Sequence, residues 1–122
     1  MILGYCRVSS RGQAYLGTSL EDQKGQILLK YPSATVYSEV FSGMKKRPIF
    51  DDLIDKLQKG DTLVVTKLDR FCRSASEGIG HMNLLTQKGI IVDILDIGVA
   101  DTKSPSGKLI LNILFRVIQL LI

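Results

Sequence analysis

The sequence predicts a single α/β domain built on a mainly parallel sheet, and three observations support that prediction. Short apolar segments alternate with segments whose apolar residues recur at helical spacing. Single helices separate the expected strands, which is the arrangement that connects parallel neighbours. The chain has 122 residues, 45% hydrophobic and 23% charged, enough for one core and too few for two. We therefore expect a layered fold of four to five strands flanked by helices.

Apolar segments bounded by polar loops mark the expected strands. A polar loop over Ser9–Gly17 follows the first strand, and another begins at Glu39 after a short second strand and runs to Arg47. A third polar segment, Lys67–Arg73, follows the third strand. Because ligands bind at the carboxyl ends of parallel strands, we expect the chemistry in these segments. The four expected strands are Ile2–Val8, Thr35–Ser38, Thr62–Thr66 and Ile90–Leu95.

Capping residues and helix breakers set the bounds of the expected helices. Thr18 or Ser19 is placed to cap a helix that runs to about Lys30. Pro48 suits the first turn of the next helix, and Gly60 lies just beyond its end. The other two expected helices are Ser74–Lys88, weakened by Gly78 and Gly80, and a last helix that opens at Ser104-Pro105.

The composition limits the classes of function. Sixteen Lys and Arg against twelve Asp and Glu give a net charge of +4, which permits an anionic partner. Cys6 and Cys72 fit neither a disulfide framework nor a zinc site, and a single histidine, His81, removes most metal chemistry. The N-terminus enters an apolar strand without a basic leader. We therefore expect a cytoplasmic, reduced protein with no membrane anchor.

The end of the chain is unusually apolar. Eleven of the fourteen residues in Leu109–Ile122 are apolar, and Asn112, Arg116 and Gln119 form one narrow polar stripe. A helix with so little polar surface is expected to pack against more than one partner. It is either a central core helix or, as we favour in so small a domain, a subunit interface. A charge introduced at Phe115 or Ile118 should then disturb assembly.

The end of the first strand carries the first candidate site. Tyr5, Arg7 and Ser9 alternate along that strand and so share one face. A guanidinium matches two oxygens of a phosphate, and a hydroxyl beside it can react there. The alternative is a strand end with a serine that serves only as a cap.

Two further segments carry clustered cations. Lys67–Arg73 contains three cations and one carboxylate, and Arg70 and Arg73 share a side if a helix begins there. Before Pro48 lies Ser42-Gly43 and then Lys45-Lys46-Arg47. Taken singly, each segment could be a solvated charged loop.

Together these segments resemble a known family. The run YCRVSSRGQ has the full Tyr-x-Arg-Val-Ser-Ser/Thr-x-x-Gln signature of the resolvase/invertase group of serine recombinases. The segments SLEDQ, SG…RP and KLDRFCR are similar to the motifs that follow in that family, in the same order. The resemblance covers nearly the whole chain.

The resemblance implies a flavodoxin-like catalytic domain that cuts and rejoins double-stranded DNA without a metal or cofactor. Ser9 matches the nucleophile, which forms a 5′-phosphoserine bond and frees a 3′-hydroxyl. Arginines hold the phosphate and the transition-state charge in this family, and they match Arg7, Arg47, Arg70 and Arg73. The other matched site positions are Tyr5 at the base of the site, Ser10 beside the nucleophile, Gln13, Gln23, Glu39, Ser42, Asp69, which would orient the arginines, and Lys67, which would contact DNA.

The general base stays open, because none of the motifs contains a histidine. Asp69, Glu39 or an arginine could take the proton of the serine. A non-enzymatic alternative is a truncated recombinase that only dimerises. A nucleotide- or phosphate-binding flavodoxin-like module is a weaker alternative, since no Gly-rich phosphate loop follows the first strand.

The chain also departs from the family pattern. Glu39 stands where the family often has Asp, and Leu121 and Ile122 stand where a Glu-Arg pair is usual. We expect residues 1–103 to form the catalytic domain and residues 104–122 to begin a long oligomerisation helix, with the C-terminal DNA-binding region absent. The family acts as dimers that form tetramers on DNA, and the resemblance implies the same here.

Overall fold

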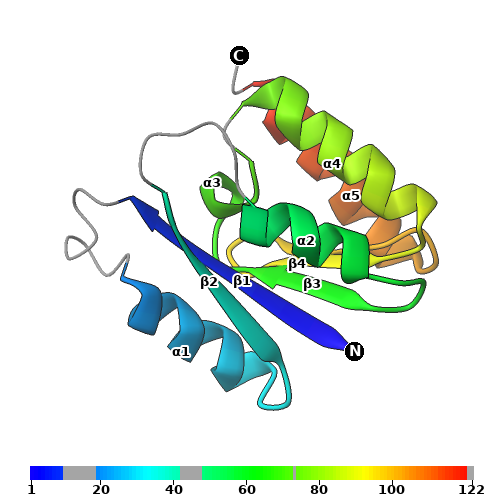
Figure 1. The fold of residues 1–122 in the computed structure, drawn as a ribbon. Coiled ribbons are helices and arrows are strands. Elements are labelled where there is room, and N and C mark those ends of the chain that lie inside the picture. The colour runs from blue at the N-terminus through cyan, green and yellow to red at the C-terminus, as the bar shows by residue number, and fades with distance from the viewer. Residues whose placement is uncertain (10–18, 42–47, 73, 121–122) are drawn as a thin grey trace.

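The computed structural model describes residues 1–9, 19–41, 48–72 and 74–120, which form five strands and five helices (Figure 1). The strands are β1 (Ile2–Ser9), β2 (Thr35–Phe41), β3 (Thr62–Val65), β4 (Ile91–Ile94) and β5 (Gly98–Ala100). The helices are α1 (Leu20–Lys30), α2 (Pro48–Lys56), α3 (Leu68–Phe71), α4 (Ala75–Gln87) and α5 (Pro105–Gln119).

All five strands belong to one sheet, in the order β2-β1-β3-β4-β5. The first four strands run parallel, and β5 pairs with β4 in the antiparallel direction. This order is that of the flavodoxin-like fold, apart from the direction of β5. The predicted fold class is therefore confirmed.

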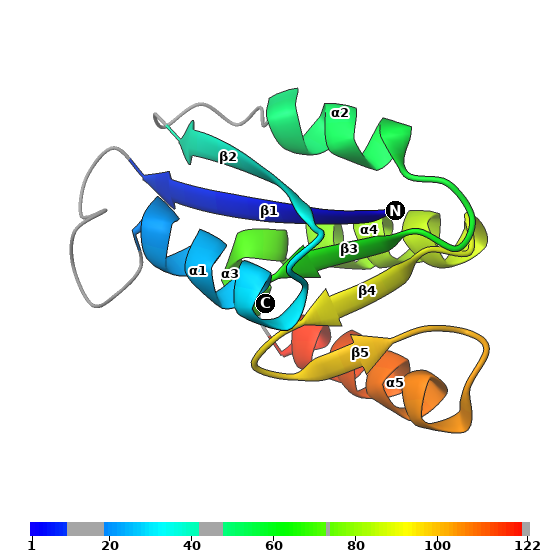
Figure 2. The ribbon, with the colours of Figure 1, turned by 90° about the horizontal axis from the view of Figure 1, so that it is seen from below.

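The two faces of the sheet carry helices of different number. On one face, α1 is the one described helix, and it packs over a small core of Cys6, Ile27 and Val64. On the other face, α2, α4 and α5 enclose the main core, which includes Tyr5 and Phe50. Figure 2 shows α1 and α2 on opposite sides of β1 and β2. The protein is thus a three-layer structure with one thin layer.

The strand order reverses between β1 and β3. The chain leaves β1 for β2 on one side and later returns past β1 to reach β3 on the other side. Right-handed crossovers in opposite directions put α1 and α2 on opposite faces. In open α/β sheets the crevice outside the carboxyl ends of the strands at such a reversal is the preferred ligand site.

The end of α1 is fixed to β4 by a buried carboxylate. Asp93 is fully buried, and its Oδ2 accepts hydrogen bonds from Lys30 Nζ at 2.6 Å and from the Tyr31 hydroxyl at 2.5 Å. Burial raises the pKa of the Tyr31 hydroxyl, and the hydrogen bond to Asp93 raises it further. These two hydrogen bonds to Asp93 therefore hold the end of α1 against the sheet.

Most expected boundaries are confirmed. Ser19 caps α1, Ser74 caps α4 and Ser104 caps α5, each by accepting a hydrogen bond from the backbone N–H three residues on. The expected end of the second strand was wrong: β2 continues through Glu39 to Phe41, because β1 offers it a partner as far as Ser9. The helix α3 and the strand β5 were not predicted as separate elements.

α5 has one buried side and one exposed apolar side. Leu114 and Ile118 are fully buried, whereas Leu109 is 60% exposed and Ile113 is 41% exposed. The close contact with α4 depends on Gly78, where a Cβ atom would lie 2.8 Å from Cys72 Sγ and 3.0 Å from Ile118 Cγ2. Gly78 therefore allows α3, α4 and α5 to approach each other.

Among the described residues, no helix is both long enough and apolar enough to cross a bilayer.

Candidate functional site

The candidate site lies at the carboxyl end of β1, next to the point where β1 and β3 separate. Tyr5 and Arg7 are buried on the face of the sheet that carries α2 and α4. β1 ends at Ser9, whose backbone lies opposite Phe41 of β2. The side chain of Ser9 lies outside the described part of the structure.

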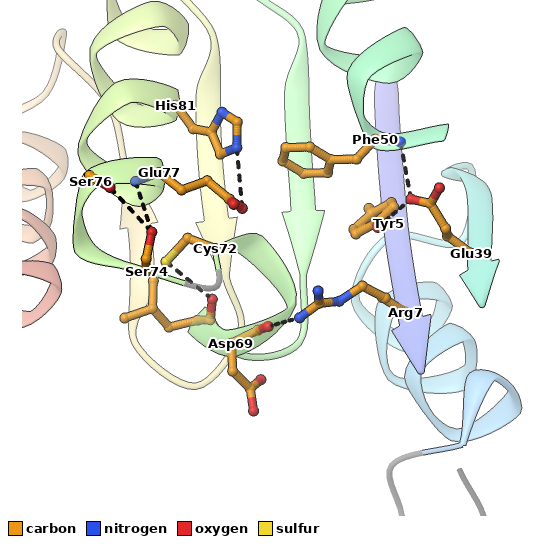
Figure 3. Close-up of polar contacts among 11 residues, drawn as sticks. Tyr5, Arg7, Glu39, Phe50, Asp69, Cys72, Ser74, Ser76, Glu77 and His81 are labelled. Carbon is orange, nitrogen blue, oxygen red and sulfur yellow. Dashed lines mark hydrogen bonds and ion pairs between the residues drawn. The ribbon is translucent and has the colours of Figure 1, made fainter. Parts of the chain in front are cut away.

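The side chain of Arg7 reaches across to α3. Its Nη2 donates a hydrogen bond to the backbone carbonyl of Asp69 (Figure 3). The carboxylate of Asp69 is 71% exposed and lies 3.7 Å from Nε of Arg70, whose side chain is largely buried. The structure thus joins Arg7 to the Lys67–Arg73 segment through the main chain of Asp69, and joins Asp69 to Arg70 through charge.

Glu39 connects β2 to the start of α2. Its carboxylate accepts hydrogen bonds from the Tyr5 hydroxyl at 2.6 Å, from Ile49 N at 3.1 Å and from Phe50 N at 3.3 Å. The two backbone donors belong to the first turn of α2, where N–H groups have no partner within the helix. A buried carboxylate there also interacts favourably with the helix dipole. Glu39 therefore caps α2 from a neighbouring strand.

A group of aromatic rings fills the space behind this carboxylate. The ring of Phe50 lies 4.8 Å from that of Tyr5, 6.1 Å from that of Phe71 and 5.0 Å from that of His81, between centroids. His81 Nε2 in turn lies 3.5 Å from the carboxylate of Glu77, one helical turn away. These rings link β1, α2, α3 and α4 directly under the site. Phe50 and His81 were not among the predicted site residues.

Gln23 lies on the opposite side of the sheet, in α1. Its side-chain Oε1 accepts a hydrogen bond from Arg7 N at 3.0 Å, and its Nε2 donates to Arg7 O at 2.9 Å. Gln23 is 2% exposed. Gln23 is therefore a buried residue that contacts the backbone of Arg7, another predicted site residue.

The structure joins six predicted site residues by direct contact in two groups: Tyr5 with Glu39, and Arg7 with Gln23, Asp69 and, through Asp69, Arg70. Lys67 is exposed at the residue before α3. Five further predicted residues lie outside the described part of the chain: Ser10, Gln13, Ser42, Arg47 and Arg73.

Among the described residues, Cys6 and Cys72 carry free thiols, and Cys6 directly precedes Arg7 in β1. Cys6 is fully buried on the α1 face, and burial raises its pKa to about 11, against the smaller opposing effect of the charges of Lys24 and Arg70. A thiol with such a pKa is not a thiolate at neutral pH. Among the described residues, no group of three or more His, Cys, Asp or Glu side chains could hold a metal ion.

We predict that Glu39→Ala destabilises the fold by about 2 to 4 kcal/mol, because the Tyr5 hydroxyl and two backbone N–H groups lose their acceptor. Tyr5→Phe removes only one of these hydrogen bonds and should cost about 1 kcal/mol. Urea unfolding of both variants measures the difference. Equal stability of the two variants would contradict the capping role of Glu39.

Comparisons with known proteins identify relatives of the chain. Residues 2–120 match the family described as Resolvase, N terminal domain. The chain is 33% identical over 124 residues to the serine recombinase PinR of Escherichia coli (strain K12), covering 97% of this chain. It is 34% identical over 115 residues to the transposon Tn552 resolvase of Staphylococcus aureus, covering 93% of this chain. The crystal structure of the N-terminal catalytic domain of TP901-1 integrase matches with a TM-score of 0.73 and 29% identity, covering 98% of this chain and 94% of that one.

The relatives in full length are longer than this chain. It spans 61% of the length of PinR and 55% of the length of the Tn552 resolvase. The matched family covers both the strands that carry the site and α5. The chain belongs to the resolvase family of serine recombinases and corresponds to its N-terminal catalytic domain.

Proposed function

We propose that this chain is the catalytic part of a DNA recombinase in which the hydroxyl of Ser9 attacks a backbone phosphate. A bond forms from Ser9 Oγ to phosphorus as the bond from phosphorus to the 3′ oxygen breaks. The Ser9 hydroxyl gives up its proton to a base as it attacks, the released oxygen takes up a proton and becomes a free 3′-hydroxyl, and the 5′ phosphate stays on Ser9. Rejoining is the reverse attack by a 3′-hydroxyl. Because one ester replaces another, the reaction requires no ATP, and in the proposal arginine side chains stabilise the transition-state charge that a metal could otherwise meet.

One observation carries this proposal. The guanidinium of Arg7 contacts the main chain of Asp69, so it reaches the segment after β3 that carries Arg70, at the reversal point of the sheet. Arg7 precedes Ser9 by two residues on the same strand. A developing phosphorane dianion at that place would be met by fixed positive charge, which is usually the largest catalytic term.

Each site residue has a proposed role. The arginines bind the phosphate and its transition state, and Tyr5, Glu39 and Asp69 hold the arginine-bearing segments in place. Glu39 already accepts three hydrogen bonds, which favours a positioning role over that of the general base. The proposed phosphate-binding arginines are Arg7, Arg47, Arg70 and Arg73. The proposed DNA-contacting residues are Ser10, Gln13, Ser42 and Lys67.

A covalent adduct tests the proposal. The chain is incubated with a DNA duplex nicked so that the cleaved strand end diffuses away and religation fails. The expected product is a protein–DNA adduct that resists denaturant, with the phosphate mapped to Ser9 by mass spectrometry of the peptide. A phosphate on Ser10 or on any other residue, or no adduct, would overturn the assignment.

We further propose that residues 1–103 form the catalytic unit and that α5 begins an oligomerisation helix through which homodimers, and tetramers on DNA, assemble. The exposed residues Leu109 and Ile113 on one side of this helix support that proposal. No observation favours the alternative in which the chain only dimerises.

The interface is tested by charge on the exposed side of α5. Ile113→Asp should leave the fold intact and shift sedimentation towards monomer. Ile118 is unsuitable for this purpose, because it is fully buried in the main core. Ile118→Asp should instead destabilise the fold by about 4 kcal/mol or more. Unchanged sedimentation of the Ile113→Asp chain would show that this side of α5 is not an interface.

A further inference from the structure

The edge of β1 that faces β3 loses its strand partner before the site is reached. β1 pairs with β2 from Leu3 to Ser9, but it pairs with β3 only from Ile2 to Gly4. The pairing ends early because β3 stops at Val65 and the chain turns away into α3. The remaining backbone groups on that edge of β1 need other partners, since buried N–H and C=O groups are almost always paired.

The backbone N–H and C=O of Arg7 point to the β3 side of β1, beyond the residues that pair with β3. The carbonyl of Met1 accepts a hydrogen bond from Thr62 N of β3 at 3.0 Å, so Met1 points towards β3. Alternate residues of a strand direct their backbone groups to the same edge. Leu3, Tyr5 and Arg7 therefore point the same way as Met1, and Arg7 lies three residues beyond the last paired position.

The side chain of Gln23 occupies the place of the missing strand. It accepts from Arg7 N and donates to Arg7 O, at 3.0 Å and 2.9 Å, as a neighbouring peptide group would. A primary amide is the only common side-chain group that offers one donor and one acceptor in this spacing. Gln23 is itself held in place, because α1 is capped by Ser19 and its Ile27 packs against Gly4.

We infer that Gln23 is a positioning residue that sets the backbone of Arg7 by replacing a strand partner, and through it the direction of the Arg7 guanidinium. The inference rests on the proposed attack by Ser9, which lies two residues further along β1. It assigns Gln23 a role in fixing the backbone of Arg7, whereas the family resemblance implied only a place at the site. The guanidinium of Arg7 is fixed at its far end by the Asp69 carbonyl, so Gln23 and Asp69 hold the two ends of this residue.

The test compares Gln23→Met with Gln26→Met. Both glutamines lie in α1, but Gln26 is exposed, so it controls for the change of side chain in this helix. Methionine keeps the length of Gln23 and removes both hydrogen bonds. We expect the rate of Ser9–DNA adduct formation at saturating DNA to fall on the order of tenfold to a hundredfold, because small misplacements of reacting groups have such effects. The affinity of Gln23→Met for DNA should stay unchanged. The rate of adduct formation by Gln26→Met should also stay unchanged.

Hydrogen exchange provides a readout independent of activity. The amide of Arg7 should exchange faster in Gln23→Met, while the amides that pair β1 with β2 keep their protection. Gln23→Glu is the second variant, because an ionised carboxylate can still accept from Arg7 N but cannot donate to Arg7 O, so the rate is measured at a pH at which this glutamate is ionised. It should not restore the rate, and burial of its charge beside Arg7 O should destabilise the fold more than Gln23→Met does.

Each outcome bears on one proposal. If the unchanged chain forms the adduct and Gln23→Met forms it equally fast per folded molecule, the inference is wrong and the proposed function stands. If Gln23→Met or Gln23→Glu weakens DNA binding and leaves the rate at saturation unchanged, Gln23 contacts DNA and the inference is also wrong. If the unchanged chain forms no adduct, the proposed function fails, and faster exchange at Arg7 then shows only a structural contact.

Discussion

A chain that carries Ser9→Ala is expected to fold normally and to form no covalent bond with DNA. The substitution removes the only oxygen that the proposed reaction transfers to phosphorus, so the loss should be complete. Ser9 is the last residue of β1 and lies outside the paired core of β3 and β4, which is why the fold should survive. Denaturing gels of the nicked-duplex reaction measure the adduct, and circular dichroism with thermal unfolding checks the fold.

Ser10→Ala is the matched control for this experiment. The neighbouring hydroxyl supports the site in the proposal but does not attack, so its loss should slow adduct formation and leave the adduct on Ser9. An adduct that persists in Ser9→Ala and disappears in Ser10→Ala would reverse the assignment of the nucleophile.

Arg7→Ala should lower the rate of adduct formation on the order of a hundredfold or more, because a fixed cation at the phosphate contributes to the transition state at about that level. Asp69→Ala should have a smaller effect. Asp69 holds Arg7 through its backbone carbonyl, which alanine retains. The substitution removes only the exposed carboxylate, whose ion pair with Arg70 Nε is long, at 3.7 Å. Single-turnover rates of the two variants at saturating DNA measure this difference.

Equal rates for Asp69→Ala and Arg7→Ala would contradict the positioning role of Asp69. If Asp69→Ala is as damaging as Arg7→Ala, then the carboxylate itself acts on the reaction, and Asp69 becomes the leading candidate for the general base. Asp69→Asn separates these roles further, since asparagine retains the backbone carbonyl and the shape of the side chain but does not accept a proton from serine.

Much of the architecture was predictable from local patterns. The caps at Ser19, Ser74 and Ser104 mark helix starts because a hydroxyl satisfies N–H groups in the same turn, a contact that lies within four residues of sequence. The four parallel strands were predictable for a similar reason, since buried parallel strands are continuous apolar runs. The motif that carries Arg7 could be located from its place at the end of a strand, and the motif that carries Arg70 from its place after one.

The contacts that shape the site were not predictable in this way. Glu39 was expected in a loop, because a charged residue after a short apolar run is typical of a strand end. Its place in β2 depends on the length of β1, and its partners Tyr5 and Phe50 are 34 and 11 residues away. The ring contact between Phe50 and His81 likewise depends on how two separate helices pack. Such pairs are consequences of tertiary structure.

The unequal layers of the fold have a consequence for local motion. In the described part of the chain, one helix, α1, covers one face over the small core of Cys6, Ile27 and Val64, whereas the other face is closed by the main core. Elements with few buried apolar contacts open at lower free energy than the whole domain. α1 should therefore detach transiently while the rest of the protein remains native, and each detachment would withdraw Gln23 from Arg7. Warming the protein would then reduce catalysis at temperatures where the fold, measured as a whole, is still intact.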